Sequence, residues 1–166
     1  MSRRHPVPDP VGPGQESVWD YPRPPRLEPA RRRIRVELDG VVIAASDRGL
    51  RVLETSHPPT YYVHPDDVRW DHLTEGGGSS WCEWKGRAAY WTVTAAGRRV
   101  ENGAWSYPEP TPRFADLADH VAFYPGQFAC FVDDERVEPQ PGGFYGGWVT
   151  AELAGPFKGA PGTLGW

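Results

Sequence analysis

The stretch that decides the fold runs from residue 34 to residue 44 and reads Ile-Arg-Val-Glu-Leu-Asp-Gly-Val-Val-Ile-Ala. Ile34, Val36 and Leu38 alternate with polar residues, which is the period-two pattern of a strand with one buried face. Asp39-Gly40 follows, a dipeptide that tolerates the positive φ angles of a two-residue type I′ turn. The apolar run at 41–44 then returns as a second strand. The sequence therefore predicts an antiparallel hairpin here.

Short strand signals separated by turn residues continue toward the C-terminus. A Gly-rich segment at 75–80 is expected to be a flexible loop. The strands that we expect are 50–54, 60–63, 81–85, 88–94, 98–101 and 128–132, with a brief pairing at 69–73. This pattern predicts a mainly β fold with antiparallel sheets.

One helix is expected after residue 111. Thr111-Pro112 supplies an N-cap residue and a proline at the first helical position. Phe114, Leu117 and Val121 then recur at helical spacing. These features predict a single short α-helix.

The chain divides into three parts by composition. Residues 1–30 contain eight Pro and two Gly without periodicity, and residues 139–166 contain eight Gly and four Pro. Such composition favours extended chain over regular elements. We therefore expect an extended Pro-rich N-terminal arm at 1–32, one domain at 33–138 and a Gly/Pro-rich C-terminal extension at 139–166.

The charge distribution disfavours a nucleic-acid partner. Residues 1–35 carry eight Arg against four acidic residues, whereas the remainder carries ten basic against eighteen acidic residues. A nucleic-acid reader usually has a basic body rather than an acidic one. No apolar run approaches the ~20 residues of a membrane span, and charge and proline occupy the place of a signal peptide. Two cysteines are too few for a disulfide framework, so we expect a cytoplasmic protein without membrane association.

Three side chains are candidates for chemistry. Cys82 precedes Lys85 by three residues, and a nearby ammonium would favour a nucleophilic thiolate. Residues i and i+3 of a strand point to opposite faces, so this pairing requires a turn at 85–86. His57 is a candidate general base for this thiol. For Cys82, structural burial without a chemical role is the better-supported alternative. Cys130 lies between Phe128 and Val132 on one strand face, and we expect it in the core.

Glu54 is predicted to lie on the inward face of its strand. Counting by two from Leu50 through Val52 places its carboxylate on the same side as these apolar residues. A buried charge requires a partner. Glu54 therefore either binds a donor on a ligand or pairs with an arginine inside the protein, and the sequence leaves both readings open.

The sequence predicts no metal site and no cofactor. There is no Cys-x-x-Cys pair and no His-Glu-x-x-His, and the five His are scattered. The glycines at 76–78 lack the following Lys and helix of a phosphate loop.

Several runs together resemble the domain-of-unknown-function 427 family. They are Leu53-Glu54-Thr55 with His57-Pro58-Pro59-x-Tyr61-Tyr62, Cys82-x-x-Lys85-Gly86-x-Ala88-x-Tyr90-Trp91, Ala104-Trp105-x-Tyr107-Pro108-x-Pro110, and His120 to Tyr124. The resemblance covers about 33–138 and points to the form with extended termini. It implies a β-tent fold, in which two antiparallel sheets meet at an angle with a pocket between them. Relatives with that tent, such as the thalidomide-binding domain of cereblon, hold zinc by cysteine pairs that this sequence lacks.

The preferred functional hypothesis is a binding module. Aromatic residues make up 13% of the chain, and Trp and Tyr suit pocket walls because they join an apolar body to a polar tip. We expect a small planar or cyclic ligand in an aromatic pocket between the sheets. Its predicted contacts are Glu54, His57, Tyr62, Trp84, Lys85, Tyr90, Trp105 and Tyr107.

Two alternatives remain open. The first is an enzyme acting on a small substrate through Cys82, or through Glu54 and His57 as acid–base partners. The second is a homo-oligomer or interaction domain, since the arm repeats a Trp-x-Tyr-Pro motif of the body at Trp19 and Trp105. A Pro-rich segment with aromatic residues can dock in a groove. Packing of this segment on the surface is the simpler reading.

Overall fold

The hairpin at 34–44 forms as predicted in the computed structural model, which describes residues 6–166. Strands β3 (Ile34–Leu38) and β4 (Val41–Ser46) pair antiparallel, with Leu38 opposite Val41. The turn residues Asp39 and Gly40 have φ angles of 47° and 84°, as a type I′ turn requires. The inward face of β3 is buried in the main core.

Strand β3 also pairs with β11 (Ala129–Val132), and β11 pairs with β12 (Glu135–Arg136), giving a sheet of order β12-β11-β3-β4. Cys130 is fully buried opposite Val36, which confirms its expected place in the core. Burial raises the pKa of the Cys130 thiol far above its usual range. This thiol is therefore protonated and enclosed.

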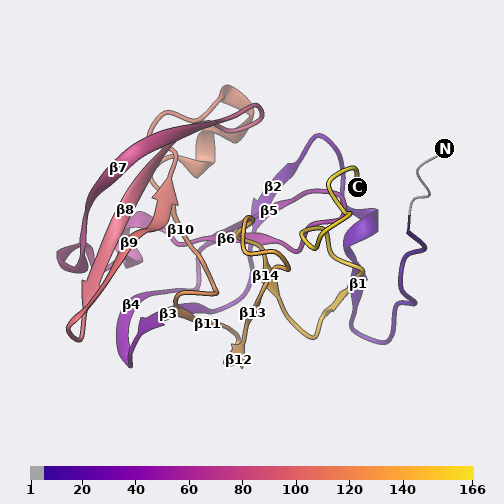
Figure 1. Cartoon of the computed structure of the whole chain (residues 1–166), viewed down its shortest axis with the longest axis horizontal. Helices are drawn as coiled ribbons and strands as arrows, with labels where there is room; N and C mark the ends of the chain where they lie inside the picture. Colours follow the sequence, from indigo (N-terminus) through magenta and orange to yellow (C-terminus); the bar gives the residue numbers. More distant parts are fainter. Residues whose placement is uncertain (1–5) are drawn as a thin grey trace.

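A second four-stranded antiparallel sheet has the order β10-β9-β8-β7. Its strands are β7 (Leu73–Cys82), β8 (Gly86–Ala95), β9 (Arg98–Ser106) and β10 (Val121–Phe123). Figure 1 shows this sheet running in a different direction from the sheet of β3, β4 and β11. The predicted mainly β, antiparallel fold is confirmed.

The expected flexible loop at 75–80 is wrong, because this segment is the middle of β7. A bulge lies between Glu75 and Ser79, and the side chain of Asn102 on β9 completes the pairing. Gly77 N donates to Asn102 Oδ1 over 3.1 Å, and Asn102 Nδ2 donates to Gly77 O over 2.9 Å. A Cβ atom at Gly76 would overlap Asn102 Oδ1, so glycine serves close approach here rather than flexibility.

The third sheet has the order β2-β5-β6, from β2 (Arg26–Pro29), β5 (Leu50–Leu53) and β6 (Thr60–Tyr62). It adjoins the second sheet immediately after β6, where Val63 and Val121 exchange backbone hydrogen bonds of 2.7 and 3.0 Å. This bridge joins the end of β6 to β10 at the edge of the second sheet.

The helix occurs where it was expected but is a 3-10 helix, η4 (Pro112–Leu117), rather than an α-helix. Phe114 has non-helical angles that break the segment, and Val121 belongs to β10 instead. The Thr111 hydroxyl does not cap the helix. It donates to Trp84 O over 2.6 Å.

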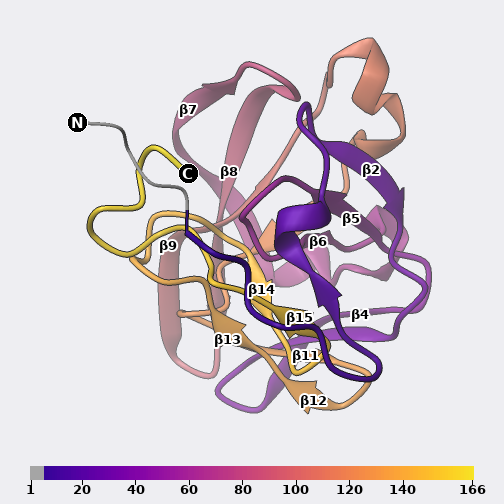
Figure 2. The same ribbon diagram turned by 90° about the vertical axis from the view of Figure 1, so that its right-hand side faces the viewer.

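The terminal segments lie side by side (Figure 2). The short strands β1 (Glu16–Ser17) and β15 (Leu153–Ala154) pair parallel, and the Trp19 ring donates from Nε1 to Pro156 O over 2.9 Å. The segment expected as an extended arm thus contributes β1, η1 (Val18–Asp20) and β2 to the fold, and its first five residues lie outside the described part. The remaining elements are η2 (Pro65–Asp67), η3 (Trp70–His72), β13 (Glu138–Pro139) and β14 (Trp148–Val149).

Among residues 6–166, no helix has the length and apolar character needed to cross a membrane.

Candidate functional site

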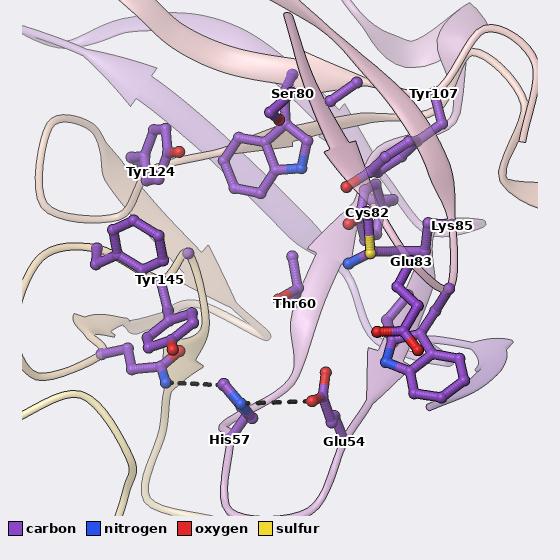
Figure 3. A pocket seen from close by; sticks show the side chains of 18 of the residues that line it. Glu54, His57, Thr60, Ser80, Cys82, Glu83, Lys85, Tyr107, Tyr124 and Tyr145 are labelled. Atoms are coloured by element: carbon purple, nitrogen blue, oxygen red, sulfur yellow. Dashed lines mark hydrogen bonds and ion pairs between the residues drawn. The ribbon is translucent and has the colours of Figure 1, made fainter. Parts of the chain in front are cut away.

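A cavity of about 440 Å³ lies between β8 and β9 on one side and β5 and β6 on the other (Figure 3). The segment after β13 forms part of its wall. All residues that the sequence singled out as ligand-binding or catalytic line this one cavity: Glu54, His57, Tyr62, Cys82, Trp84, Lys85, Tyr90, Trp105 and Tyr107. The structure therefore brings the complete candidate set together.

The deep wall of the cavity is aromatic. Tyr62, Trp105 and Tyr107 belong to one buried apolar cluster, in which the Tyr62 ring meets Trp105 edge-on at a centroid distance of 6.5 Å. Trp105 also packs against Tyr124 at 4.5 Å. Tyr62 is completely buried, and its hydroxyl has no hydrogen-bond partner among the described residues. Burial raises the pKa of Tyr62 and Tyr107, so both phenols remain protonated donors.

The turn between β7 and β8 brings Cys82 and Lys85 to the same cavity. Cys82 pairs with Gly86 across the hairpin, so residues 83–85 form the turn instead of the expected strand. Thr111 N donates to Lys85 O over 3.0 Å and helps to fix this turn. The sequence indicated that Cys82 and Lys85 can approach each other only if the chain turns here. The structure has this turn. The Lys85 ammonium lies 5.5 Å from the centre of the Tyr107 ring.

A hydrogen-bond network fixes the imidazole of His57. The side chain of Gln140 accepts from Gly147 N over 3.1 Å through Oε1 and donates to Lys158 O over 2.8 Å through Nε2. These two backbone partners determine which end of the amide is nitrogen. The same Nε2 lies 3.0 Å from His57 Nδ1, so Nδ1 accepts the second amide hydrogen.

His57 therefore carries its own hydrogen on Nε2, which lies 3.7 Å from Glu54 Oε2. Among the described residues, His57 is the only basic side chain within 4 Å of the Glu54 carboxylate, and no arginine pairs with Glu54. Figure 3 shows both side chains at one edge of the cavity. The sequence left two readings open for Glu54, a contact to a ligand or a pair with an internal arginine. No such arginine pair occurs within residues 6–166.

His57 is held neutral. Burial lowers its pKa to about 4, assisted by the positive charges of Lys158, Arg23 and Lys85. One ring nitrogen accepts from Gln140 and the other carries hydrogen, so neither offers a free lone pair to a substrate. The arrangement suits a hydrogen-bond donor better than a general base.

The model of the family described as domain of unknown function (DUF427) matches residues 26–138, about two thirds of the chain. The chain belongs to this family. The match runs from the start of β2 to the first residue of β13, and it includes every candidate residue named from the sequence. A comparison with curated proteins finds none that matches the chain.

The sequence did not indicate four further cavity residues, Tyr124, Gln140, Tyr145 and Lys158. Three of them follow residue 138, beyond the region that matches the DUF427 model. Tyr145 packs edge-on against His57 at 4.8 Å. A Gly/Pro-rich segment without periodicity carries no signal for such contacts.

The same segment approaches the aromatic wall closely. A Cβ atom at Gly146 would overlap the Trp105 ring, and one at Gly147 would lie 2.5 Å from Gln140 Oε1. Glycine is therefore required at both positions for the segment to cover the cavity. The extension after the family domain completes the site in this chain.

A second cavity, of about 700 Å³, lies at the β7 bulge and is lined in part by Trp81, Trp91 and Glu109. None of the buried hydroxyl groups without a partner belongs to its lining. No three His, Cys, Asp or Glu side chains within residues 6–166 are grouped so as to hold a metal ion.

Proposed function

We propose that the protein binds a small compound with a planar ring in the cavity between β5–β6 and β8–β9. The observation that carries this proposal is the lining of one cavity, in which the rings of Trp105, Tyr107 and Tyr124 lie together with the polar side chains of Glu54 and His57. Apolar walls with a few polar groups are the usual composition of a small-molecule site.

The aromatic composition of the wall supports a flat ligand. Trp105, Tyr107 and Tyr124 offer ring faces and edges, and aromatic pairs gain about 0.5–1.5 kcal/mol beyond the area that they bury. The volume of about 440 Å³ is in the range of small-molecule sites. Polar groups from several elements, such as Glu54 and His57, would fix the orientation of the ring.

A covalent reaction at Cys82 is the second candidate function. The observation that favours it is the 83–85 turn, which places the partly exposed Cys82 and Lys85 on one cavity. An acid–base pair of Glu54 and His57 receives less support, because His57 Nδ1 accepts from Gln140 and Nε2 carries a hydrogen, so neither nitrogen offers a lone pair.

Native mass spectrometry of the protein purified from its source, compared with a denatured sample, tests the binding proposal. We expect a co-purified compound that denaturation releases. Thr60→Phe fills the cavity and should abolish this extra mass, whereas Thr94→Phe places the same ring on the exposed side of β8 and should retain it. Equal occupancy in both variants would place the compound elsewhere and overturn the proposal.

A further inference from the structure

The lysines of this chain are confined to the cavity. The sequence contains sixteen Arg and two Lys, and both lysines, Lys85 and Lys158, line the same cavity. They come from different elements, Lys85 from the β7–β8 turn and Lys158 from the segment after β15. Everywhere else, the chain uses arginine for positive charge.

Neither lysine pairs with an Asp or Glu side chain in the described part of the chain. Every salt bridge found there uses Arg or His as its cation, for example Arg51 with Glu28 at 2.6 Å. Lys158 Nζ donates to Trp166 O over 3.4 Å and lies 5.7 Å from the centre of the Tyr145 ring. Lys85 donates no such hydrogen bond among the described residues, and a partly buried ammonium group without a counter-charge is an unfavourable state that an anion relieves.

Other hydrogen-bond donors line the same cavity. The His57 Nε2 hydrogen and the Tyr107 hydroxyl add to the ammonium hydrogens. Two carboxylates also line the cavity, those of Glu54 and Glu83. Glu54 faces the His57 ring, and Glu83 is exposed to solvent. Burial is the main cause of the lowered pKa of His57, and the positive charges of Lys158 and Lys85 lower it further.

We infer that the ligand is a planar ring compound bearing a carboxylate or a phosphate group, and that Lys85 and Lys158 bind this group. The inference rests on the proposed function, and it adds the charge of the ligand and the two residues that select it. A compact ammonium suits this task because it acts as a point charge in a confined space, whereas guanidinium needs a planar two-point partner.

The test compares ring probes of one size and different charge. Benzoate, phenyl phosphate, benzamide and benzylamine are titrated against the ¹⁵N-labelled full-length protein, and the indole signals of Trp105 and Trp84 report binding. We expect at least one of the two anions to bind about tenfold more tightly than neutral benzamide. This preference should shrink at high salt, because mobile ions screen the attraction between charges. The better of the two anions distinguishes a carboxylate ligand from a phosphate ligand.

Lys85→Met and Lys158→Met keep the aliphatic stem and remove the charge. Each should weaken anion binding severalfold and leave benzamide binding unchanged. Arg113→Met removes the same charge from an exposed residue outside the cavity and is the control. It should leave all four affinities unchanged, which separates a local contact from an effect of net charge.

The outcomes distinguish the two proposals. If benzamide or benzylamine binds at Trp105 as tightly as both anions, or if neither lysine variant weakens the anions, the ligand is not selected by these charges and the inference is wrong. In that case ring binding in the cavity still stands. If no probe shifts the indole signals and the protein purifies without a bound compound, the proposed function fails as well.

Discussion

Gln140 donates a hydrogen bond of 3.0 Å to Nδ1 of His57 and so joins the Gly/Pro-rich C-terminal segment to the loop after β5. The contact spans 83 residues of sequence and is part-buried. It fixes the tautomer of the imidazole because the amide of Gln140 is itself oriented by two backbone groups. The polar edge of the cavity is thus set by a residue outside the region that matches the family model.

The neutral state of His57 predicts a pH dependence of stability. The folded-state pKa is lowered to about 4 from the ordinary 6.5, so above pH 6.5 the residue is neutral in both states and contributes no slope. As the pH falls from 6.5 toward 4, the unfolded chain binds the proton first, and stability should decrease by up to about 3 kcal/mol. Urea unfolding at pH 7.5, 5.5 and 4.5 measures this change.

His57→Gln is the matched variant for this measurement. It keeps a hydrogen-bonding side chain but cannot titrate, so the destabilisation between pH 6.5 and 4 should become smaller. His120 also has a pKa lowered by burial and contributes in the same direction, so some slope should remain. An unchanged slope in His57→Gln would contradict the neutral assignment.

Gln140→Leu should release His57 from its tautomer. The substitution leaves Gly147 N and Lys158 O without their partner, so we expect a loss of stability of about 2 kcal/mol or more. The long-range ¹H–¹⁵N correlations of the imidazole should show the Nε2–H form in the unmodified protein and a mixture in the variant. Finding mainly the Nδ1–H form in the unmodified protein would refute the network as described.

The sequence predicted the strands well where the pattern is local. The hairpin of β3 and β4 follows from alternating residues and Asp39-Gly40, and both features act within a few residues. The loop expected at 75–80 failed because Asn102, from a strand two positions away in the sheet, pairs with the backbone of Gly77. A glycine that permits flexibility and one that permits close approach look identical in sequence.

The candidate site was predicted in part. Of the residues named from the sequence, four lie on paired strands, namely Tyr62, Cys82, Tyr90 and Trp105, and the others lie in the loops and turns that directly follow β5, β7 and β9. Gln140 and Lys158 could not be found in this way, since their position depends on a terminal segment held by contacts such as Trp19 Nε1 to Pro156 O. The arm that resembled an independent interaction motif instead packs on the segment that carries Lys158.

Tyr62→Phe tests whether the buried hydroxyl of Tyr62 is unpaired. The hydroxyl that it removes is buried and unpaired, so the free energy of unfolding should stay unchanged or rise by up to about 1 kcal/mol. Tyr90→Phe is the contrast, because its hydroxyl donates to Ser80 Oγ over 2.7 Å. A clear destabilisation by Tyr62→Phe in urea unfolding would show that the hydroxyl has a partner after all.

The two cysteines should react very differently with a thiol reagent. Cys130 is fully buried with a raised thiol pKa, whereas Cys82 is partly exposed at the cavity. Because alkylation requires an accessible thiolate, iodoacetamide should add one group to the folded protein and two in denaturant, as counted by intact mass. Peptide mapping should place the first group on Cys82, and Cys82→Ser should remove it.

Benzoate or phenyl phosphate should slow the labelling of Cys82 if the cavity is where these probes bind. Labelling of Cys130 in the folded state would contradict its burial. A folded protein that resists the reagent entirely would contradict the accessibility of Cys82 and would also remove the covalent reaction as a candidate function.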